Sequence, residues 1–191
     1  VFGSVQNAVG GVTRTYDSST KTLTLKFGAA GEIASYISQL TAEDKEASIV
    51  IFEGQELNDA DVNTMKEFNN SIIDLRNVTT VSTNTTYSGW GFTNVWPYNS
   101  SIVFPDKTPI STLKSLTSAI YLLNLDSADG NKFNVATTKT DDNKKIIDLS
   151  SVYKYVKGDK GSFTTLDLAC NGSSTEGFFA NADLEGITNL V

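Results

Sequence analysis

The chain has 191 residues, of which 39% are hydrophobic, and a formal net charge of −7. This length and apolar content suit one folded domain with a sizeable core and exclude a disordered chain. Arginine occurs only twice and no basic run is present, so the backbone phosphates of nucleic acid have no electrostatic counterpart here. We therefore predict no nucleic-acid partner.

Histidine is absent from the sequence. Its absence removes the Ser-His-Asp and Cys-His nucleophile pairs, zinc sites with histidine ligands and the imidazole base that works near neutral pH. The single cysteine, Cys170, excludes an intrachain disulfide and is interpreted as a small buried hydrophobe. We expect a protein that is not an enzyme, and we predict no catalytic residues, no metal and no cofactor.

The first predicted element is a β-hairpin over residues 11–27, "GVTRTYDSSTKTLTLKF". Apolar and polar residues alternate on both sides of "DSST", which is typical of two strands joined by a turn. The first layer of a stacked array needs a cover for its core. We interpret residues 1–28 as an N-terminal hairpin cap that includes the first strand.

An aliphatic–x–aliphatic triplet then recurs at intervals of 19 to 29 residues. These intervals lie close to the period of leucine-rich repeats. The middle residues of the seven triplets are Thr24, Val50, Asp74, Val103, Asn124, Asp148 and Asp167. "ITNLV" at the C-terminal end resembles a shortened eighth copy. Because strand side chains alternate, the flanking aliphatics, such as Ile73 and Leu75, are predicted to point inward and the middle residues to the open face of a sheet.

Amphipathic helices are predicted between the first strands. Residues 30–40 place four apolar side chains on one helical face, namely Ile33, Tyr36, Ile37 and Leu40. Residues 57–70 offer Asn58 as N-cap and three apolar side chains on one side, namely Val62, Met65 and Phe68. A third, shorter helix is predicted over residues 109–118.

Strand and helix together form a unit that cannot cover its own apolar face, so consecutive units are expected to stack. The predicted fold is an α/β, leucine-rich-repeat-like solenoid with a parallel sheet and the N-terminal hairpin cap, forming one domain over residues 1–191. The alternative is an ordinary α/β domain with parallel strands.

The longest interval between triplets contains an aromatic-rich segment, "TYSGWGFTNVWPYN" at residues 86–99. We interpret residues 81–100 as an insertion loop, and such loops on repeat scaffolds commonly bind partners. Flat rings suit stacking on sugars or anchoring a protein. The candidate binding residues are Tyr87, Trp90, Phe92, Trp96 and Tyr98. In the alternative interpretation these rings cover an exposed end or side of the solenoid.

A second candidate site is the row formed by Asn124, Asp148 and Asp167. On adjacent parallel strands these side chains would lie ~4.8 Å apart. Two carboxylates at that distance raise each other's proton affinity or bind calcium. The alternative is a solvated polar position that recurs because the repeat recurs.

Several segments resemble the BspA-like leucine-rich repeat proteins of bacterial surfaces, common in Bacteroides-type organisms. They are "YDSSTKTLTL", "EGQELNDADVNTMKEFNNSIIDLRNV", "IIDLSSV" and "TLDLA", and the resemblance covers residues 14–80 and 119–170. The asparagine of the pattern L-x-L-x-x-N is matched only by Asn171. The resemblance implies a secreted or lipid-anchored protein of the bacterial outer membrane that binds host proteins or other cells, with no catalytic residues.

The sequence therefore favours a non-enzymatic cell-surface adhesion module that recognises a protein or glycan on another cell or matrix. No apolar run is long enough to span a membrane. Because the chain starts at Val1 without a methionine, we expect that a preceding signal segment or another domain has been removed. The resemblance implies that the precursor carries a lipid anchor. The alternative function is a polysaccharide-binding or polysaccharide-cleaving β-solenoid that uses Asp148 and Asp167.

Overall fold

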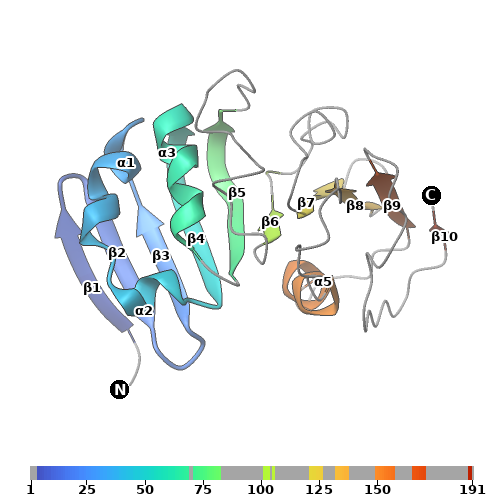
Figure 1. Ribbon diagram of the computed structural model, residues 1–191, viewed down its shortest axis with the longest axis horizontal. Helices are drawn as coiled ribbons and strands as arrows, with labels where there is room; N and C mark the ends of the chain where they lie inside the picture. The colour runs from blue at the N-terminus through green and yellow to red at the C-terminus, as the bar shows by residue number, and fades with distance from the viewer. Residues whose placement is uncertain are drawn as a thin grey trace.

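The computed structural model shows an α/β fold built on one mixed sheet (Figure 1). It describes residues 4–68, 71–82, 101–103, 105, 121–126, 132–137, 149–157, 165–170 and 189–190. Within these ranges ten strands pair in chain order, from β1 to β10. Most neighbouring pairs are parallel; β1–β2, β2–β3 and β7–β8 are antiparallel. Each described strand thus lies beside the strands that precede and follow it in the sequence.

The predicted hairpin is present as β2 (Val12–Asp17) and β3 (Thr22–Lys26). An additional strand, β1 (Ser4–Val9), pairs with the outer edge of β2. Gly10 and Gly11 connect β1 to β2 with φ angles of 56° and 86°. Both angles lie in the left-handed region that a two-residue type I′ hairpin turn requires, and glycine adopts it without strain.

The central strands are parallel and their predicted positions are confirmed. They are β4 (Ile49–Leu57), β5 (Ile72–Val81), β6 (Ser101–Val103) and β7 (Tyr121–Asp126). The strands β8 (Lys132–Thr137), β9 (Thr165–Cys170) and β10 (Asn189–Leu190) follow. No strand was expected at β8, which runs antiparallel to β7.

Both long predicted helices are present, each ending in a 3₁₀ turn. The first consists of α1 (Glu32–Tyr36) and η1 (Ile37–Gln39), and the second of α3 (Asp59–Asn63) and η2 (Thr64–Glu67). Their predicted apolar faces are buried, except that Ile37 is half-buried. A short helix that was not predicted, α2 (Ala42–Lys45), lies between them in sequence. The helix predicted over residues 109–118 falls outside the described residues.

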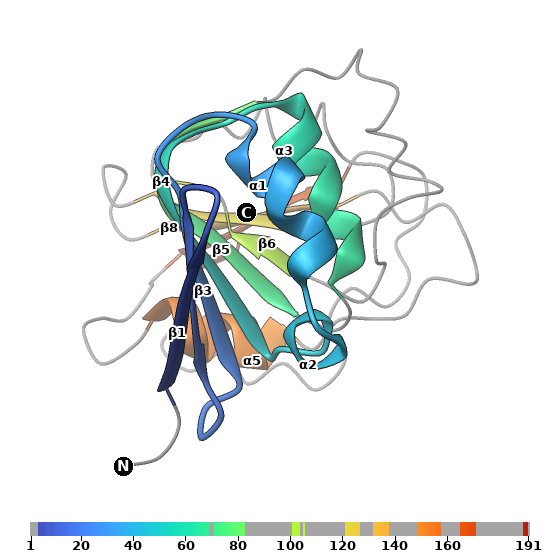
Figure 2. The same cartoon turned by 90° about the vertical axis from the view of Figure 1, so that its left-hand side faces the viewer.

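One apolar core lies between the sheet and these helices (Figure 2). Strand residues Leu23, Leu25, Val50 and Phe52 are fully buried in it, together with helix residues such as Ile33. Phe52 also meets Phe68 edge to face, with ring centroids 6.1 Å apart. The predicted inward position of Ile73 and Leu75 is confirmed, since they are 0% and 1% exposed. This core fixes α1 and α3 to one face of the sheet.

Two buried carboxylates join elements that are far apart in sequence. Asp44 forms the capping box of α2 with Thr41 and also accepts hydrogen bonds from Arg14 Nε at 3.0 Å and Nη2 at 2.5 Å. Asp61 forms the capping box of α3 with the predicted N-cap Asn58. A capping box satisfies helix N–H groups that have no partner within the helix.

Asp61 also connects one strand–helix unit to the unit before it. Its carboxylate accepts hydrogen bonds from the backbone N–H groups of Gly31 and Ala34, both at 2.8 Å, at the beginning of α1. The side chain is fully buried. One carboxylate therefore caps its own helix and holds the neighbouring helix in place.

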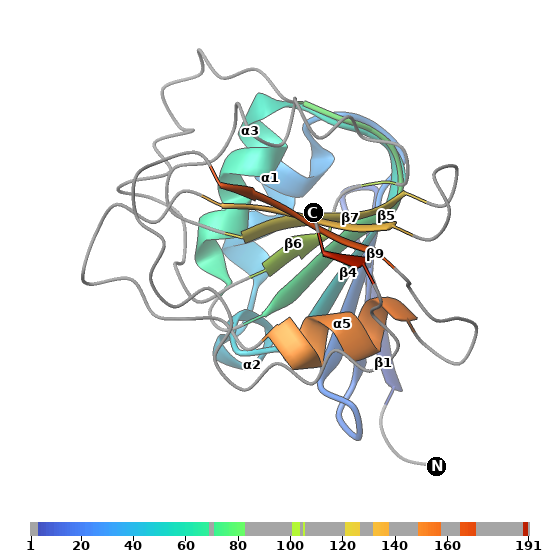
Figure 3. The ribbon, with the colours of Figure 1, turned by 90° about the vertical axis from the view of Figure 1, so that its right-hand side faces the viewer.

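The last described helix, α5 (Leu149–Lys157), lies on the other face of the sheet (Figures 2 and 3). Asp74 follows Ile73 along β5 and therefore points away from the main core, and it contacts Tyr155 of α5. The strand expected at residues 146–149 is wrong at Leu149, which is the first residue of α5. The face that was expected to be open is thus covered at β5.

Candidate functional site

A cluster of charged and polar side chains in the described part lies under α5. It consists of Asp74 and Arg76 on β5 and Tyr155 on α5. Arg76 donates to Asp74 through Nε at 3.0 Å and Nη2 at 2.8 Å, and Tyr155 Oη donates to the same carboxylate at 2.6 Å. The guanidinium carbon of Arg76 also lies 5.4 Å from the centre of the Tyr155 ring. We call these three residues the β5–α5 cluster.

The position of Asp74, the middle residue of the triplet Ile73–Asp74–Leu75, differs from the prediction. Asp74 was predicted on the open sheet face, yet it is only 3% exposed because α5 packs across it. Its register partners across the sheet are Ile51 on β4 and Val103 on β6. The helix supplies two buried valines, Val152 and Val156, which lie beside Tyr155 at helical spacing. This stripe is why α5 requires a sheet face to cover it.

The cluster perturbs the ionisation of its members. Burial is the largest single effect on Asp74 and favours its neutral form, but hydrogen bonds from Arg76 and Tyr155 and the charge of Arg76 together hold the pKa of Asp74 below its ordinary value. Burial, together with the negative charge of Asp74, raises the pKa of Tyr155. At neutral pH the cluster therefore contains a carboxylate, a guanidinium and a neutral phenol.

Because the members of the β5–α5 cluster are hydrogen-bonded to one another, the cluster is better suited to hold α5 against β5 than to catalyse a reaction. Both Asp74 oxygens already accept hydrogen bonds within the cluster. The side chain of Arg76 is 29% exposed, whereas that of Asp74 is 5% exposed. The geometry therefore describes a polar joint between strand and helix.

Part of the same sheet face is formed by β2, β3 and β4, away from α5. Register pairs Thr15 with Thr24 and Thr24 with Ile51, and these three side chains are half-buried. Farther along the strands Lys26 pairs with Glu53, with Nζ and Oε2 3.5 Å apart. We call the surface formed by Thr15, Thr24 and Ile51 the threonine–isoleucine face. The next residue across the sheet is Asp74 on β5, the register partner of Ile51.

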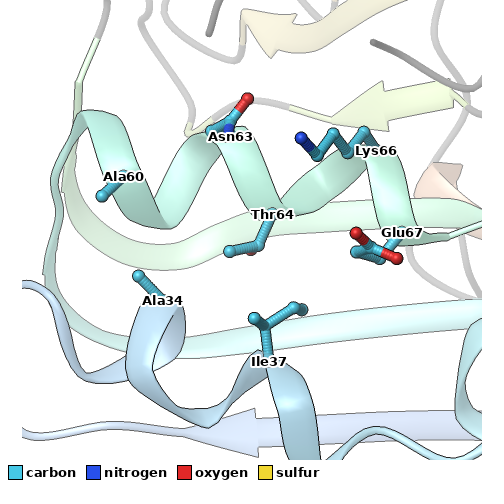
Figure 4. A pocket seen from close by; sticks show the side chains of 7 residues that line it. All are labelled: Ala34, Ile37, Ala60, Asn63, Thr64, Lys66 and Glu67. Carbon is cyan, nitrogen blue, oxygen red and sulfur yellow. The ribbon is translucent and has the colours of Figure 1, made fainter.

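A hollow of about 320 Å³ lies on the opposite side of the molecule, between α1 and α3 (Figure 4). Figure 4 shows Ala34 and Ile37 of the first helix facing Thr64 and Glu67 of the second. The Thr64 hydroxyl is already used, since it donates to the backbone oxygen of Asp61 at 2.5 Å. We interpret the hollow as the groove between two stacked helices.

The predicted site residues are only partly within the described ranges. Outside them lie Tyr87, Trp90, Phe92, Trp96, Tyr98 and Asp148. Asn124 lies on β7 and Asp167 on β9, but β8 separates them, with Asn134 in register with both. The predicted row also put two strand steps, about 10 Å, between Asn124 and Asp167, but it gave the middle place to the strand of Asp148, and that place is taken by β8 with Asn134.

The β5–α5 cluster was not predicted, although its signals were present. Arg76 follows Asp74 by two residues on one strand, which places both on one face. The sequence "LSSVYKYVK" repeats apolar residues at helical spacing through Leu149, Val152 and Val156. What the sequence did not disclose is that these two segments, 81 residues apart, meet.

Comparison of the chain with protein-family models, with curated proteins and with solved structures found no match. Within the described residues no group of three or more histidine, cysteine, aspartate or glutamate side chains is arranged to hold a metal ion. In the same ranges no helix has the length and apolar character needed to span a membrane.

Proposed function

We propose that this chain is a non-enzymatic binding module, a leucine-rich-repeat-like solenoid that recognises a protein or glycan on another cell or matrix. The observation that carries the proposal is the sheet order, which follows the chain from strand to strand. Units that contact only their sequence neighbours are typical of solenoids, which use extended faces for binding. The bond from Asp61 to the preceding helix supports the same interpretation.

The sheet face opposite α1 and α3 is the surface proposed for binding. In the described part of that face, β2 to β4 present threonine and isoleucine side chains that are half-buried. The described rings of Tyr16, Phe27, Tyr36, Phe52 and Phe68 are all buried. Because the residues described on β2 to β4 include no exposed aromatic ring, this part of the face suits a protein surface better than a sugar ring.

The aromatic segment 81–100 supports the glycan part of the proposal. Tyr87, Trp90, Phe92, Trp96 and Tyr98 keep their proposed role as stacking or anchoring residues. The BspA-like resemblance supports a location at the bacterial cell surface, outside the cell. Under this proposal the protein needs no cofactor.

The experiment compares wild type with two surface variants against a panel of extracellular-matrix proteins and a glycan array. Thr24→Arg places a large cation on the threonine–isoleucine face, and the double variant Trp90→Ala/Trp96→Ala removes both tryptophans. Ser38→Arg, on the exposed side of η1, is the matched control for the added charge. We expect a protein ligand to be lost with Thr24→Arg and a glycan ligand with the double variant.

Two results would contradict the proposal. If a ligand bound wild type and both variants equally well, neither the threonine–isoleucine face nor the aromatic segment would be its binding surface. Release of reducing ends from a polysaccharide by wild type but not by Asp148→Asn would replace the binding module with the polysaccharide-cleaving alternative.

A further inference from the structure

We propose that α5 is a separable cover on the sheet face, which opens and closes while the rest of the fold stays intact. This inference rests on the proposed function, because it describes how access to the binding face is regulated. Three features of the described residues support it: the separation of two apolar clusters, the self-sufficient Asp74–Arg76 pair, and a buried hydroxyl without a partner.

The apolar contacts under α5 are separate from the main core. The main core runs without interruption from Val12 on β2 to Ile102 on β6. Val103, Val152 and Val156 are buried as well, but they do not belong to that cluster. Val103 is the register partner of Asp74 and therefore lies on its face. Removal of α5 would expose this small group and leave the main core covered.

The polar contacts under α5 also survive its removal. Arg76 holds Asp74 through two side-chain hydrogen bonds, and its backbone N–H donates a third at 3.0 Å. Among the side chains of α5 that the structure describes, Tyr155 alone connects to the pair, through its hydrogen bond and through the stacking of Arg76 on its ring. An uncovered Asp74 therefore stays paired, and opening avoids the large penalty of leaving a buried charge without its partner.

A third observation concerns Ser101 at the beginning of β6. Its Oγ atom is buried and has no hydrogen-bond partner, although the residue is only 1% exposed. Ser101 pairs with Ile72, two residues before Asp74, so it lies on the same face. A buried hydroxyl without a partner is unfavourable, and water that enters on opening would satisfy it. Closure of α5 is thus stabilised less than closure over a fully satisfied surface.

The open state would extend the binding face. The threonine–isoleucine face ends at Ile51, whose register partner Asp74 is hidden by α5. Opening joins Asp74, Arg76 and Val103 to that surface, which then carries a charged pair beside apolar residues. A protein partner with a polar rim around an apolar centre would fit it, and binding would shift the population towards the open state.

The test uses two adjacent residues of β6 as reporters on opposite faces. Val103→Cys places a thiol under α5, and Ile102→Cys places one in the main core. Both are made with Cys170→Ser so that no native thiol reacts. The rate of reaction with 5,5′-dithiobis(2-nitrobenzoic acid) is measured under native conditions, and each rate is corrected for the global stability of its variant.

We expect the thiol at position 103 to react about 100-fold faster than the thiol at 102, as for a local opening of lower free energy than global unfolding. Adding Tyr155→Phe removes one hydrogen bond between α5 and β5 and should raise the uncorrected rate at 103 about fivefold. Lys154→Gln, on the exposed side of α5, is the control and should change neither rate.

Equal corrected rates at both positions would overturn the cover, and so would a rate at 103 that Tyr155→Phe leaves unchanged. The outcome is independent of any ligand. A partner that binds while the thiol at 103 stays protected would leave the proposed function standing without the cover. A reactive thiol in a protein that binds nothing would leave the cover standing without the proposed function.

Discussion

The two faces of the sheet differ in the residues that they bury. On the face covered by α1 and α3, which we call the helix-covered face, aliphatic and aromatic residues from five neighbouring strands and two helices form one continuous core. On the α5 face, the same strands present threonines, half-buried isoleucines and a charged pair in which the carboxylate of Asp74 is buried and Arg76 is half-buried. Because strand side chains alternate, one strand can stabilise the fold with half of its residues and leave the other half for recognition.

The largest loss of unfolding free energy should come from a substitution on the helix-covered face. Phe52→Ala is expected to destabilise the fold by about 3–5 kcal/mol, because a fully buried ring in a continuous core leaves a cavity. Thr24→Ala, on the neighbouring strand but the other face, should change stability by less than about 1 kcal/mol. Denaturant unfolding of both variants measures the difference, and similar losses would remove the distinction between the faces.

Asp61→Ala should cost somewhat less, about 2–4 kcal/mol. The change leaves the N–H groups of Gly31, Ala34 and Asn58 without their acceptor in a buried site. Hydrogen exchange should rise at Gly31 and Ala34, in the neighbouring helix, as well as in α3. Glu43→Ala removes an exposed acid from a first helical turn and serves as control. Unchanged exchange in α1 would mean that Asp61 does not connect the two units.

Asp74→Asn tests the charged pair on the other face, and we expect a loss of about 1–3 kcal/mol at neutral pH. The lowered pKa of Asp74 means that the unfolded chain binds more protons than the folded protein in acid. Its contribution to stability is therefore complete above about pH 4 and is lost as the pH falls below it. The variant should show a flatter acid limb in unfolding free energy against pH, whereas a limb as steep as that of wild type would contradict the assignment.

Tyr155→Phe should have the smallest effect, about 1 kcal/mol, because one hydrogen bond is lost while the ring stays in place. The raised pKa of Tyr155 means that the folded protein keeps a proton that the unfolded chain releases above about pH 10. Stability should therefore fall with rising pH in that alkaline range, and the fall should be smaller in the variant. Thermal unfolding from pH 8 to pH 11 measures it, and identical pH curves would count against the buried phenol.

Much of the first half could be predicted from sequence, because local signals and tertiary structure agree there. The apolar spacing of residues 30–40, the N-cap Asn58 and the alternation around "DSST" each name one structure without knowledge of the rest of the chain. The middle of β5 was harder. The sheet face on which Asp74 lies was predicted correctly. Its burial was not, because Asp74 is covered by α5, whose Tyr155 lies 81 residues later in the sequence.

The repeat pattern itself misled at one position. The letters "IIDL" occur at residues 72–75 and again at 146–149. The first copy continues into the β-branched "NVTTV" and forms β5, whereas the second continues into "SSVYKYVK", whose apolar spacing is helical, and Leu149 begins α5. The last residue of the same four letters therefore lies in a strand as Leu75 and in a helix as Leu149, because the residues after it favour different periods.

Two strands were missed because their signals are weak. Before β2, only the pair Gly10-Gly11 indicated a hairpin turn, and β1 is too polar to be recognised by hydrophobicity. The alternation in "KFNVAT" is typical of a strand, but the search for aliphatic triplets passed over β8. Because β8 was omitted, the expected row placed Asp148 between Asn124 and Asp167, at the position where β8 carries Asn134.

The independence of the two faces is tested most directly by native-state hydrogen exchange at increasing sub-denaturing concentrations of guanidinium chloride. Our account predicts that the amides of α5 exchange through an opening of lower free energy and smaller denaturant dependence than the amides of β4 and β5. A single shared isotherm, in which α5, β4 and β5 open together with the same free energy and slope, would contradict it.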